Sequence, residues 1–301
     1  MAIVNAAVLA SINAQLKKDW QDGFKSVKTN HDRFTMHIPS TTASNDYAWV
    51  NELAEVREWI GERVVNDLKV SKYSIANKDF ELTHGVKRTD IEDDQLGMHS
   101  FIVKGQGEKF AKFPGKKAWS VLADGFTHTC FDGQYFFDTD HPVFANHDGT
   151  GAETSVSNMQ AGVEPLWILV DASQLIKPVV WQERKKPVFT SMTKLDDESV
   201  FMKNEFRFGA DSRGNTGLSL WQLAFASKAE LTAENVKANR TAMKQFKRDG
   251  GEPLGVNPTI CLVGASNVDK AEELFLNEKL PDGTRNPLYK KCEVIECPWW
   301  E

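Results

Sequence analysis

The chain has 301 residues and a mass of 33.8 kDa, with 41% hydrophobic and 26% charged residues. This composition is typical of a folded globular protein of one large or two ordinary domains. A net charge of −6 argues against a protein whose main task is to bind nucleic-acid backbones, since that requires a basic surface. Four cysteines without a C-x-x-C pair argue against a disulfide scaffold and a zinc ribbon. No apolar run approaches 18 residues, so we expect no membrane partner.

The N-terminal segment is predicted to be a short amphipathic helix. Val4, Val8, Ile12 and Leu16 recur every four residues, and the segment lacks the leading positive charge of a signal peptide. Residues 33–46 then alternate apolar and polar side chains before becoming small and polar. This pattern predicts a strand that leads into an extended linker.

Residues 47–87 are predicted to form a long hairpin. Apolar residues recur at period two in its second half, with changes of phase that suggest bulges. A projecting hairpin cannot bury its own apolar side chains, so it lies either on the body of the protein or under another subunit. Aromatic residues and arginine are the types that dominate interface energies. We therefore expect an intersubunit interface at these residues: Trp49, Arg57, Glu58, Trp59, Glu62, Arg63 and Tyr73.

A long, interrupted helix is predicted over residues 93–128. Trp119, Leu122, Ala123 and Phe126 form an i, i+3, i+4, i+7 stripe in its second half. Two glycines at 105 and 107 weaken the helix, and Pro114 is expected to open a second helical segment.

The second half of the chain mixes strand and helix patterns. Buried strands are predicted at 166–171 and 259–265, further strands at 200–208, 218–226 and 289–296, and a tight loop at "GADSRGNTG" (209–217). Thr232 is expected to cap a helix that runs to about residue 247, and Ser266 to cap another. Without a regular βαβ repeat, the predicted fold class is α+β.

The segment "CFDGQYFFDTDHPVFANHDGT" (130–150) has the residue types of a metal site. Its carboxylates and imidazoles suit zinc, manganese or iron, so one hypothesis is a metal-dependent hydrolase that uses Asp138, Asp140, His141 and His147. The alternative is a structural loop, because all candidates lie in one segment and aspartates commonly bond their own backbone in turns. A nucleophilic Cys130 beside a histidine is suggested only by proximity in the sequence. No enzyme hypothesis has a complete set of groups, so we expect no catalytic, cofactor-binding or metal residues.

Several long segments resemble, in the same order, motifs of the major head subunit of Mu-like phages, the gpT family. They include "IPSTTASNDYAWV", "VREWIGERV", "KRTDIEDDQLG", "GFTHTCFDGQYFFDTDHPV" and "VFMKNEFRFGADSRGNTGLSLWQLA". The resemblance implies a Hong Kong 97-type major capsid protein fold. The implied division is an N-terminal arm (1–46), an E-loop (47–87), a peripheral domain (88–226) with a spine helix at about 93–128, and a mostly axial domain (227–301) that returns to the peripheral domain at its C-terminus.

The function implied by the resemblance is that of a structural, self-assembling capsid protein. It would form pentamers and hexamers of an icosahedral tailed-phage head around double-stranded DNA, with only weak non-specific DNA contact. Expected partners are other copies of itself, a scaffold or protease, a portal and a decoration protein. The expected location is the virion, after assembly in the cytoplasm of the bacterial host. Besides the hydrolase, the alternative is a tail or adhesion module that binds a partner.

Overall fold

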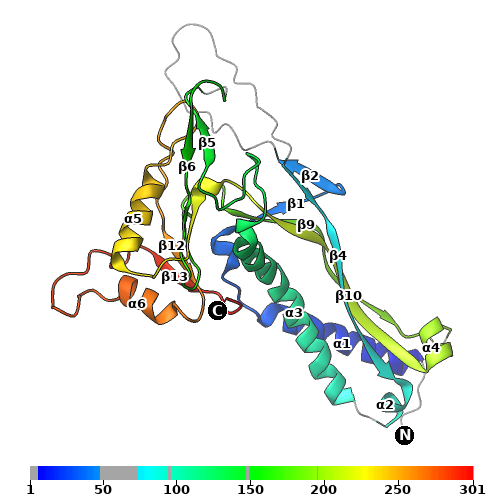
Figure 1. Cartoon of the computed structure of the whole chain (residues 1–301). Coiled ribbons are helices and arrows are strands. Elements are labelled where there is room, and N and C mark those ends of the chain that lie inside the picture. The colour runs from blue at the N-terminus through cyan, green and yellow to red at the C-terminus, as the bar shows by residue number, and fades with distance from the viewer. Residues whose placement is uncertain (1–5, 48–72, 94–95, 147–148, 195, 301) are drawn as a thin grey trace, which may run out of the picture.

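The computed structural model describes residues 6–47, 73–93, 96–146, 149–194 and 196–300. Its fold is α+β, as predicted, and elongated, with two sheets at different ends of the molecule (Figure 1). The helices are α1 (Ala6–Ser26), α2 (Arg88–Glu92), α3 (Leu96–Ala123), α4 (Glu198–Lys203), α5 (Ala233–Lys244) and α6 (Val268–Leu276). Three short 3-10 helices are η1 (His31–Arg33), η2 (Asp124–Phe126) and η3 (Trp221–Leu223). In this part of the chain no helix combines the length and apolarity needed to cross a bilayer.

The first sheet has four strands in the order β1 (Thr35–Pro39), β9 (Val179–Met192), β10 (Glu205–Leu218) and β4 (Lys78–Lys87). β10 is antiparallel to both of its neighbours, whereas β1 runs parallel to β9. The predicted tight loop at 209–217 is wrong, because these residues continue the 14-residue strand β10. The strand β9 is not among the predicted elements, because the charged run in its middle, residues 182–187, is typical of a solvated surface segment.

The second sheet has five short strands in the order β13 (Glu293–Glu296), β12 (Ile260–Val263), β8 (Trp167–Val170), β11 (Ala224–Ser227) and β7 (Met159–Gln160). The buried strands predicted at 166–171 and 259–265 are confirmed as β8 and β12. This sheet joins strands from both sides of the expected domain boundary at 226. That boundary therefore does not separate the two sheets.

Two further two-stranded sheets complete the fold: β2 (Ser44–Tyr47) with β3 (Tyr73–Ala76), and β5 (His141–Phe144) with β6 (Glu153–Val156). The hairpin predicted over 47–87 needs a correction at its second limb. Residues 78–87 form β4, which pairs with β10 in the first sheet rather than projecting. Strand 73–76 pairs instead with the end of the expected N-terminal arm.

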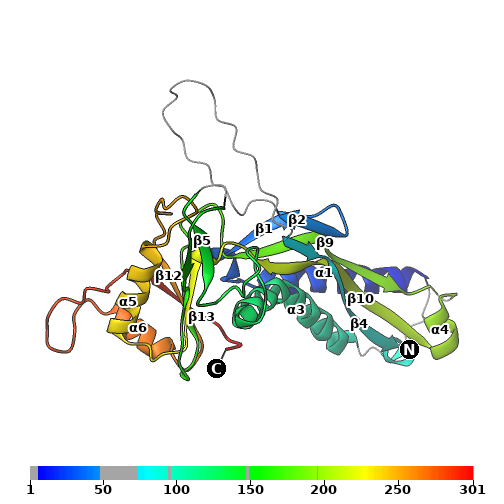
Figure 2. The ribbon, with the colours of Figure 1, turned by 45° about the horizontal axis from the view of Figure 1, so that its top comes forward.

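Helices α1 and α3 cross each other and cover one face of the first sheet (Figures 1 and 2). The predicted N-terminal helix is confirmed and longer than expected; it buries Leu9, Ile12, Leu16 and Trp20 against α3 and the sheet. The predicted helix at 93–128 is confirmed as α3, but its predicted interruption is wrong. Pro114 lies inside one continuous 28-residue helix.

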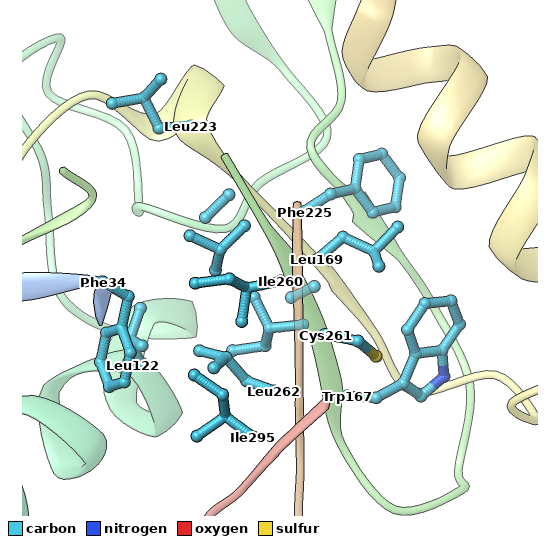
Figure 3. Packing of buried hydrophobic residues seen from close by; sticks show 14 of the residues in the cluster. Phe34, Leu122, Trp167, Leu169, Leu223, Phe225, Ile260, Cys261, Leu262 and Ile295 are labelled. Atoms are coloured by element: carbon cyan, nitrogen blue, oxygen red, sulfur yellow. The ribbon is translucent and has the colours of Figure 1, made fainter. Parts of the chain in front are cut away.

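Gly107, one of the residues of α3 that weaken helix formation, lies where α3 packs closely against α1. A Cβ atom on Gly107 would lie 2.1 Å from the main-chain oxygen of Trp20, so glycine allows the backbones of α1 and α3 to approach. The last turns of α3 enter the main core, where Leu122 lies beside Phe34 and the strands of the second sheet (Figure 3).

Two other predicted elements differ from the structure. Residues 198–203 form the helix α4 rather than part of a strand, and Asn204 reverses the chain into β10 with a left-handed φ of 54°. The strand predicted at 218–226 is broken by η3 before β11 begins. The helix at 233–244 is confirmed, with Thr232 Oγ1 accepting a hydrogen bond from the Asn235 N–H, whereas α6 is preceded by Asn267 instead of Ser266.

Candidate assembly surface

The strands β2 and β3, which we call the loop base, dock on the first sheet through a buried glutamine. Gln182 of β9 is fully buried; its Oε1 accepts a hydrogen bond of 2.6 Å from the Tyr47 hydroxyl. Its Nε2 donates to the main-chain oxygen of Ile75 and to Asn77 Oδ1, at 3.0 and 2.8 Å. All polar atoms of this side chain therefore hold the two ends of the segment 48–72 against the sheet.

Tyr73 is the one predicted interface residue that the structure describes. It lies opposite Tyr47 in the β2–β3 ladder, and its hydroxyl accepts a 2.9 Å hydrogen bond from the Leu218 N–H. Burial raises the pKa of the Tyr73 hydroxyl. Gly217 makes room for this contact, because a Cβ there would lie 2.2 Å from Ile75 Cδ1. Tyr73 thus anchors the loop base within its own chain.

The other predicted interface residues lie outside the described residues: Trp49, Arg57, Glu58, Trp59, Glu62 and Arg63. Their intersubunit role stays a prediction. The strands on either side of these residues, β2 and β3, are held in place by the first sheet.

Two pairs of exposed apolar side chains lie at the end of the molecule farthest from the second sheet. This apolar tip consists of Met98 and Phe101 on α3 and Phe201 and Met202 on α4, with exposed fractions of 69%, 76%, 79% and 70%. The Arg88 N–H donates a 3.0 Å hydrogen bond to the Asn204 carbonyl, which holds the start of α2 beside the end of α4. Both ribbon views place α4 and the start of α3 at this end (Figures 1 and 2). Large apolar side chains exposed together mark interaction surfaces.

Residues 130–146 form a hydrogen-bonded structure around a buried histidine. His141 is completely buried, stacks on the Trp221 ring at 4.1 Å between centroids, and its Nδ1 lies 2.7 Å from Asp132 Oδ2. The Cys130 thiol donates a 3.0 Å hydrogen bond to the other oxygen of Asp132. Burial and the Asp132 carboxylate raise the pKa of the Cys130 thiol, which is the opposite of what a nucleophilic cysteine requires.

The predicted metal ligands do not gather around His141. Asp138 accepts hydrogen bonds from the backbone N–H groups of Thr139 and Tyr135, and Asp140 is exposed. His147 lies outside the described residues. Two clusters of the described chain bring together three possible metal ligands, and neither includes Asp138 or Asp140. The alternative of a structural loop explains this segment, because the buried Phe136 and Phe137 anchor it to the core.

Two basic segments of the sequence, residues 182–187 and 243–250, are partly neutralised by ion pairs. Lys185 forms an ion pair with Asp211 across β9 and β10, and Arg248 forms one with Glu252. These pairs reduce the positive potential that a phosphate backbone would meet.

Comparisons with known proteins agree over nearly the whole chain. The family model described as the Mu-like prophage major head subunit gpT matches residues 9–300. The "Major capsid protein" of Escherichia phage Mu is 39% identical over 284 residues, covering 93% of each chain. The "Mu-like prophage FluMu major head subunit" of Haemophilus influenzae is 38% identical, covering 92% of each. Among solved structures, a chain of the procapsid of bacteriophage JBD30 has 41% identity and a TM-score of 0.87, covering 98% of this chain and 100% of that one. A chain of the JBD30 capsid has 33% identity and a TM-score of 0.75, covering 99% of each.

Proposed function

Since the chain belongs to the family of Mu-like prophage major head subunits, gpT, we propose that it forms the pentamers and hexamers of an icosahedral phage head around double-stranded DNA. The predicted family and the phage capsid fold are confirmed, and the protein is a structural capsid protein, not an enzyme, and a component of the virion. The observation that carries the proposal is the whole-chain match to a procapsid subunit at a TM-score of 0.87.

We propose a domain division that follows the two sheets, not the boundaries in sequence that were expected at residues 87 and 226. Residues 1–46 serve as the N-terminal arm, which contributes β1 to the first sheet, and the E-loop leaves and re-enters through the loop base. The first sheet with the spine helix α3 serves as the peripheral domain. The five-stranded sheet with α5 and α6 serves as the axial domain, with β7, β8 and β11 supplied from residues before 228.

Identical subunits in a closed ring need a heterologous contact, in which one surface meets a different surface of the next copy. We propose that the E-loop segment and the apolar tip provide two such surfaces. We propose that Trp49 and Trp59 are apolar anchors, and that Arg57, Glu58 and Arg63 form ion pairs with a neighbour. Glu62 belongs to the same proposed contact, to which Tyr73 contributes by fixing the loop base.

One further kind of partner is supported by a relative. Another JBD30 structure, whose matched chain has 29% identity and a TM-score of 0.76, is a capsid decorated with minor capsid protein trimers. We propose that a decoration protein binds this head as well, and that a scaffold, a protease and a portal act during its assembly in the bacterial cytoplasm. Packaged DNA makes weak contacts, because a net charge of −6 gives little counterion release.

Electron microscopy of the overexpressed full-length chain tests the proposal. Closed shells or five- and six-fold rings in negative stain are the expected result. A small closed oligomer by light scattering, with no rings or shells in the presence of the phage's other head proteins, would instead support the tail or adhesion alternative.

The proposed loop contact has a separate test in the double variant Arg57→Glu/Arg63→Glu. We expect fewer particles and lower heat resistance of those that form, because each reversed charge would face a like charge on the neighbour. The matched control Arg57→Lys/Arg63→Lys keeps both charges and should retain most of the yield. Wild-type yield and heat resistance in the charge-reversed variant would remove these arginines from the interface.

A further inference from the structure

The corner between α1 and β1 brings together three side chains that can bind a metal. His31 and Asp32 lie in η1, and His37 lies in the middle of β1. Asp32 Oδ1 is 3.3 Å from His31 Nε2 and 2.9 Å from His37 Nε2. The three ligand atoms all lie within 4.8 Å of one another.

His31 has no hydrogen-bond partner although it is buried. Only 4% of the residue is exposed, and neither Nδ1 nor Nε2 makes a hydrogen bond. Its Nδ1 faces α3, where a Cβ on Gly115 would lie 3.1 Å away, and its Nε2 faces the Asp32 carboxylate. A buried polar group without a hydrogen-bond partner is costly, and both ring nitrogens of His31 lack one.

Apart from His37, whose Nε2 is within hydrogen-bond distance of Asp32 Oδ1 at 2.9 Å, the nearby cationic side chains do not occupy this carboxylate. Arg33 is paired with Glu293 of β13 at 2.5 Å, and Lys177 donates to the main-chain oxygen of Asp32, not to its carboxylate. The side chains of Asp32 and His37 are 60% and 48% exposed. An ion could therefore enter from solvent and keep water on its open side.

We propose that His31 Nε2, His37 Nε2 and Asp32 Oδ1 bind one divalent transition-metal ion, for which zinc is the best match. Two imidazoles and one carboxylate with an open position form a known kind of zinc site. Zinc–nitrogen and zinc–oxygen bonds of about 2.0–2.2 Å in a tetrahedron place ligand atoms about 3.3 Å apart. The observed separations of 2.9 and 3.3 Å need only a small adjustment to reach that value.

The second cluster of possible ligands, Cys130, Asp132 and His141, does not support the same inference. Both Asp132 oxygens already accept hydrogen bonds from the other two groups, and burial raises the pKa of the Cys130 thiol. A metal there would have to displace a satisfied buried network. At the α1–β1 corner a metal ion would supply the partner that the His31 ring lacks.

The position of the site suggests what bound metal would do. It would tie the turn after α1 to the first residues of the sheet and hold α1, the described part of the N-terminal arm, at a fixed angle. Since the ligands come together only in the folded chain, metal binding would stabilise the folded state.

The test is metal titration of the full-length protein after dialysis against a chelator. Equilibrium dialysis with zinc, and the visible spectrum of cobalt bound in its place, should show one ion per chain for the wild type. His37→Ala and Asp32→Asn change exposed side chains and should each lower zinc affinity by about tenfold or more. The exposed His128 lies elsewhere, so His128→Ala is the matched control and should bind zinc as the wild type does.

A second measurement covers the case in which the chain binds zinc at another site. Added zinc should raise the unfolding temperature of the wild type and of His128→Ala, but not that of His37→Ala. Equal zinc affinity and equal thermal stabilisation in the wild type, His37→Ala and Asp32→Asn would overturn the proposal. The absence of cobalt or zinc binding to the wild type would overturn it too.

Discussion

Several glycines in this chain are required for close packing, not for turns. Cβ atoms on Gly107, Gly214 and Gly217 would lie 2.1, 2.5 and 2.2 Å from Trp20 O, Gln182 O and Ile75 Cδ1. None of the three has a positive φ. This explains the two main errors made from the sequence, the broken helix at 93–128 and the loop at 209–217. From local propensity alone, a glycine predicts the end of a helix or strand. Only the tertiary structure shows that these glycines stand where a neighbour leaves no room for a methyl group.

Gly107→Ala should destabilise the protein by about 1–3 kcal/mol, because the added methyl group forces the backbones of α1 and α3 apart. Gly105→Ala is the matched control in the same helix. A Cβ there would meet nothing within 4 Å, so this change should be neutral or stabilise by up to about 1 kcal/mol. Chemical denaturation of both variants measures the difference. Equal effects would mean that the helices do not cross at Gly107.

Asp132 should stabilise the folded state in a pH-dependent way. Burial acts to raise its pKa, but the hydrogen bonds from His141 and Cys130 outweigh burial and hold the pKa below its ordinary value of 3.8. Asp132→Ala leaves both partners unsatisfied and should cost about 1–3 kcal/mol at neutral pH. A lowered carboxyl pKa contributes stability above pH 3.8 that disappears as the pH falls through the folded-state pKa. The difference in unfolding free energy between wild type and variant should therefore shrink in acid. A constant difference at all pH values would contradict this assignment.

At the scale of elements, strongly periodic segments were predictable and paired segments were not. The stripe of α1 and the apolar strands β8 and β12 are local patterns, and the structure confirms them. The partner of β4 was missed because nothing within residues 78–87 shows that β10, more than 100 residues later, lies beside it. The same holds for the site residues: Gln182 looked like part of a solvated basic run, and only the arrival of β2 and β3 buries it.

The docking of the loop base should depend on a coupling between Gln182 and Tyr47. Gln182→Leu removes the buried hydrogen bonds to the Tyr47 hydroxyl and to the Ile75 carbonyl, which should cost about 1–3 kcal/mol of unfolding free energy. Tyr47→Phe should cost less in the Gln182→Leu background than in the wild type, because the shared hydrogen bond is already lost. A double-mutant cycle by urea denaturation measures this coupling. Strict additivity would show that the hydrogen bond contributes nothing.

At the scale of the whole molecule, an elongated subunit has most of its surface available to neighbours. The two sheets, the loop base and the apolar tip lie at separate places along it (Figure 2). The family and the capsid fold could be recognised from ordered motifs along the chain. The apolar tip could not, since α3 and α4 are about 100 residues apart and reach the same end of the molecule only because β10 returns beside β4.

Phe101→Ser combined with Phe201→Ser should reduce particle assembly while leaving the fold intact, since both side chains are exposed within the subunit. Val163→Ser is the matched control, because Val163 is 97% exposed but lies outside the tip. Particle yield by sedimentation, with circular dichroism of the soluble protein, separates assembly from folding. An equal loss of particles in the control would show that the tip has no special role.

The strands of the two sheets are connected by two short crossings that run side by side, residues 171–178 and 219–223. The Ser219 N–H donates a hydrogen bond to the Pro178 carbonyl, and the Ser219 hydroxyl donates one to the Lys177 carbonyl. The Asp171 N–H donates one to the Leu223 carbonyl, so the two crossings are hydrogen-bonded to each other. Helix α3 spans the same gap, with Val103 and Phe110 in one core and Trp119 and Leu122 in the other. A subunit that serves rings of five and rings of six has to adopt more than one curvature. In the proposed head, any bending between the two sheets of this molecule would have to occur in the paired crossings, and the uninterrupted helix α3 beside them would resist it.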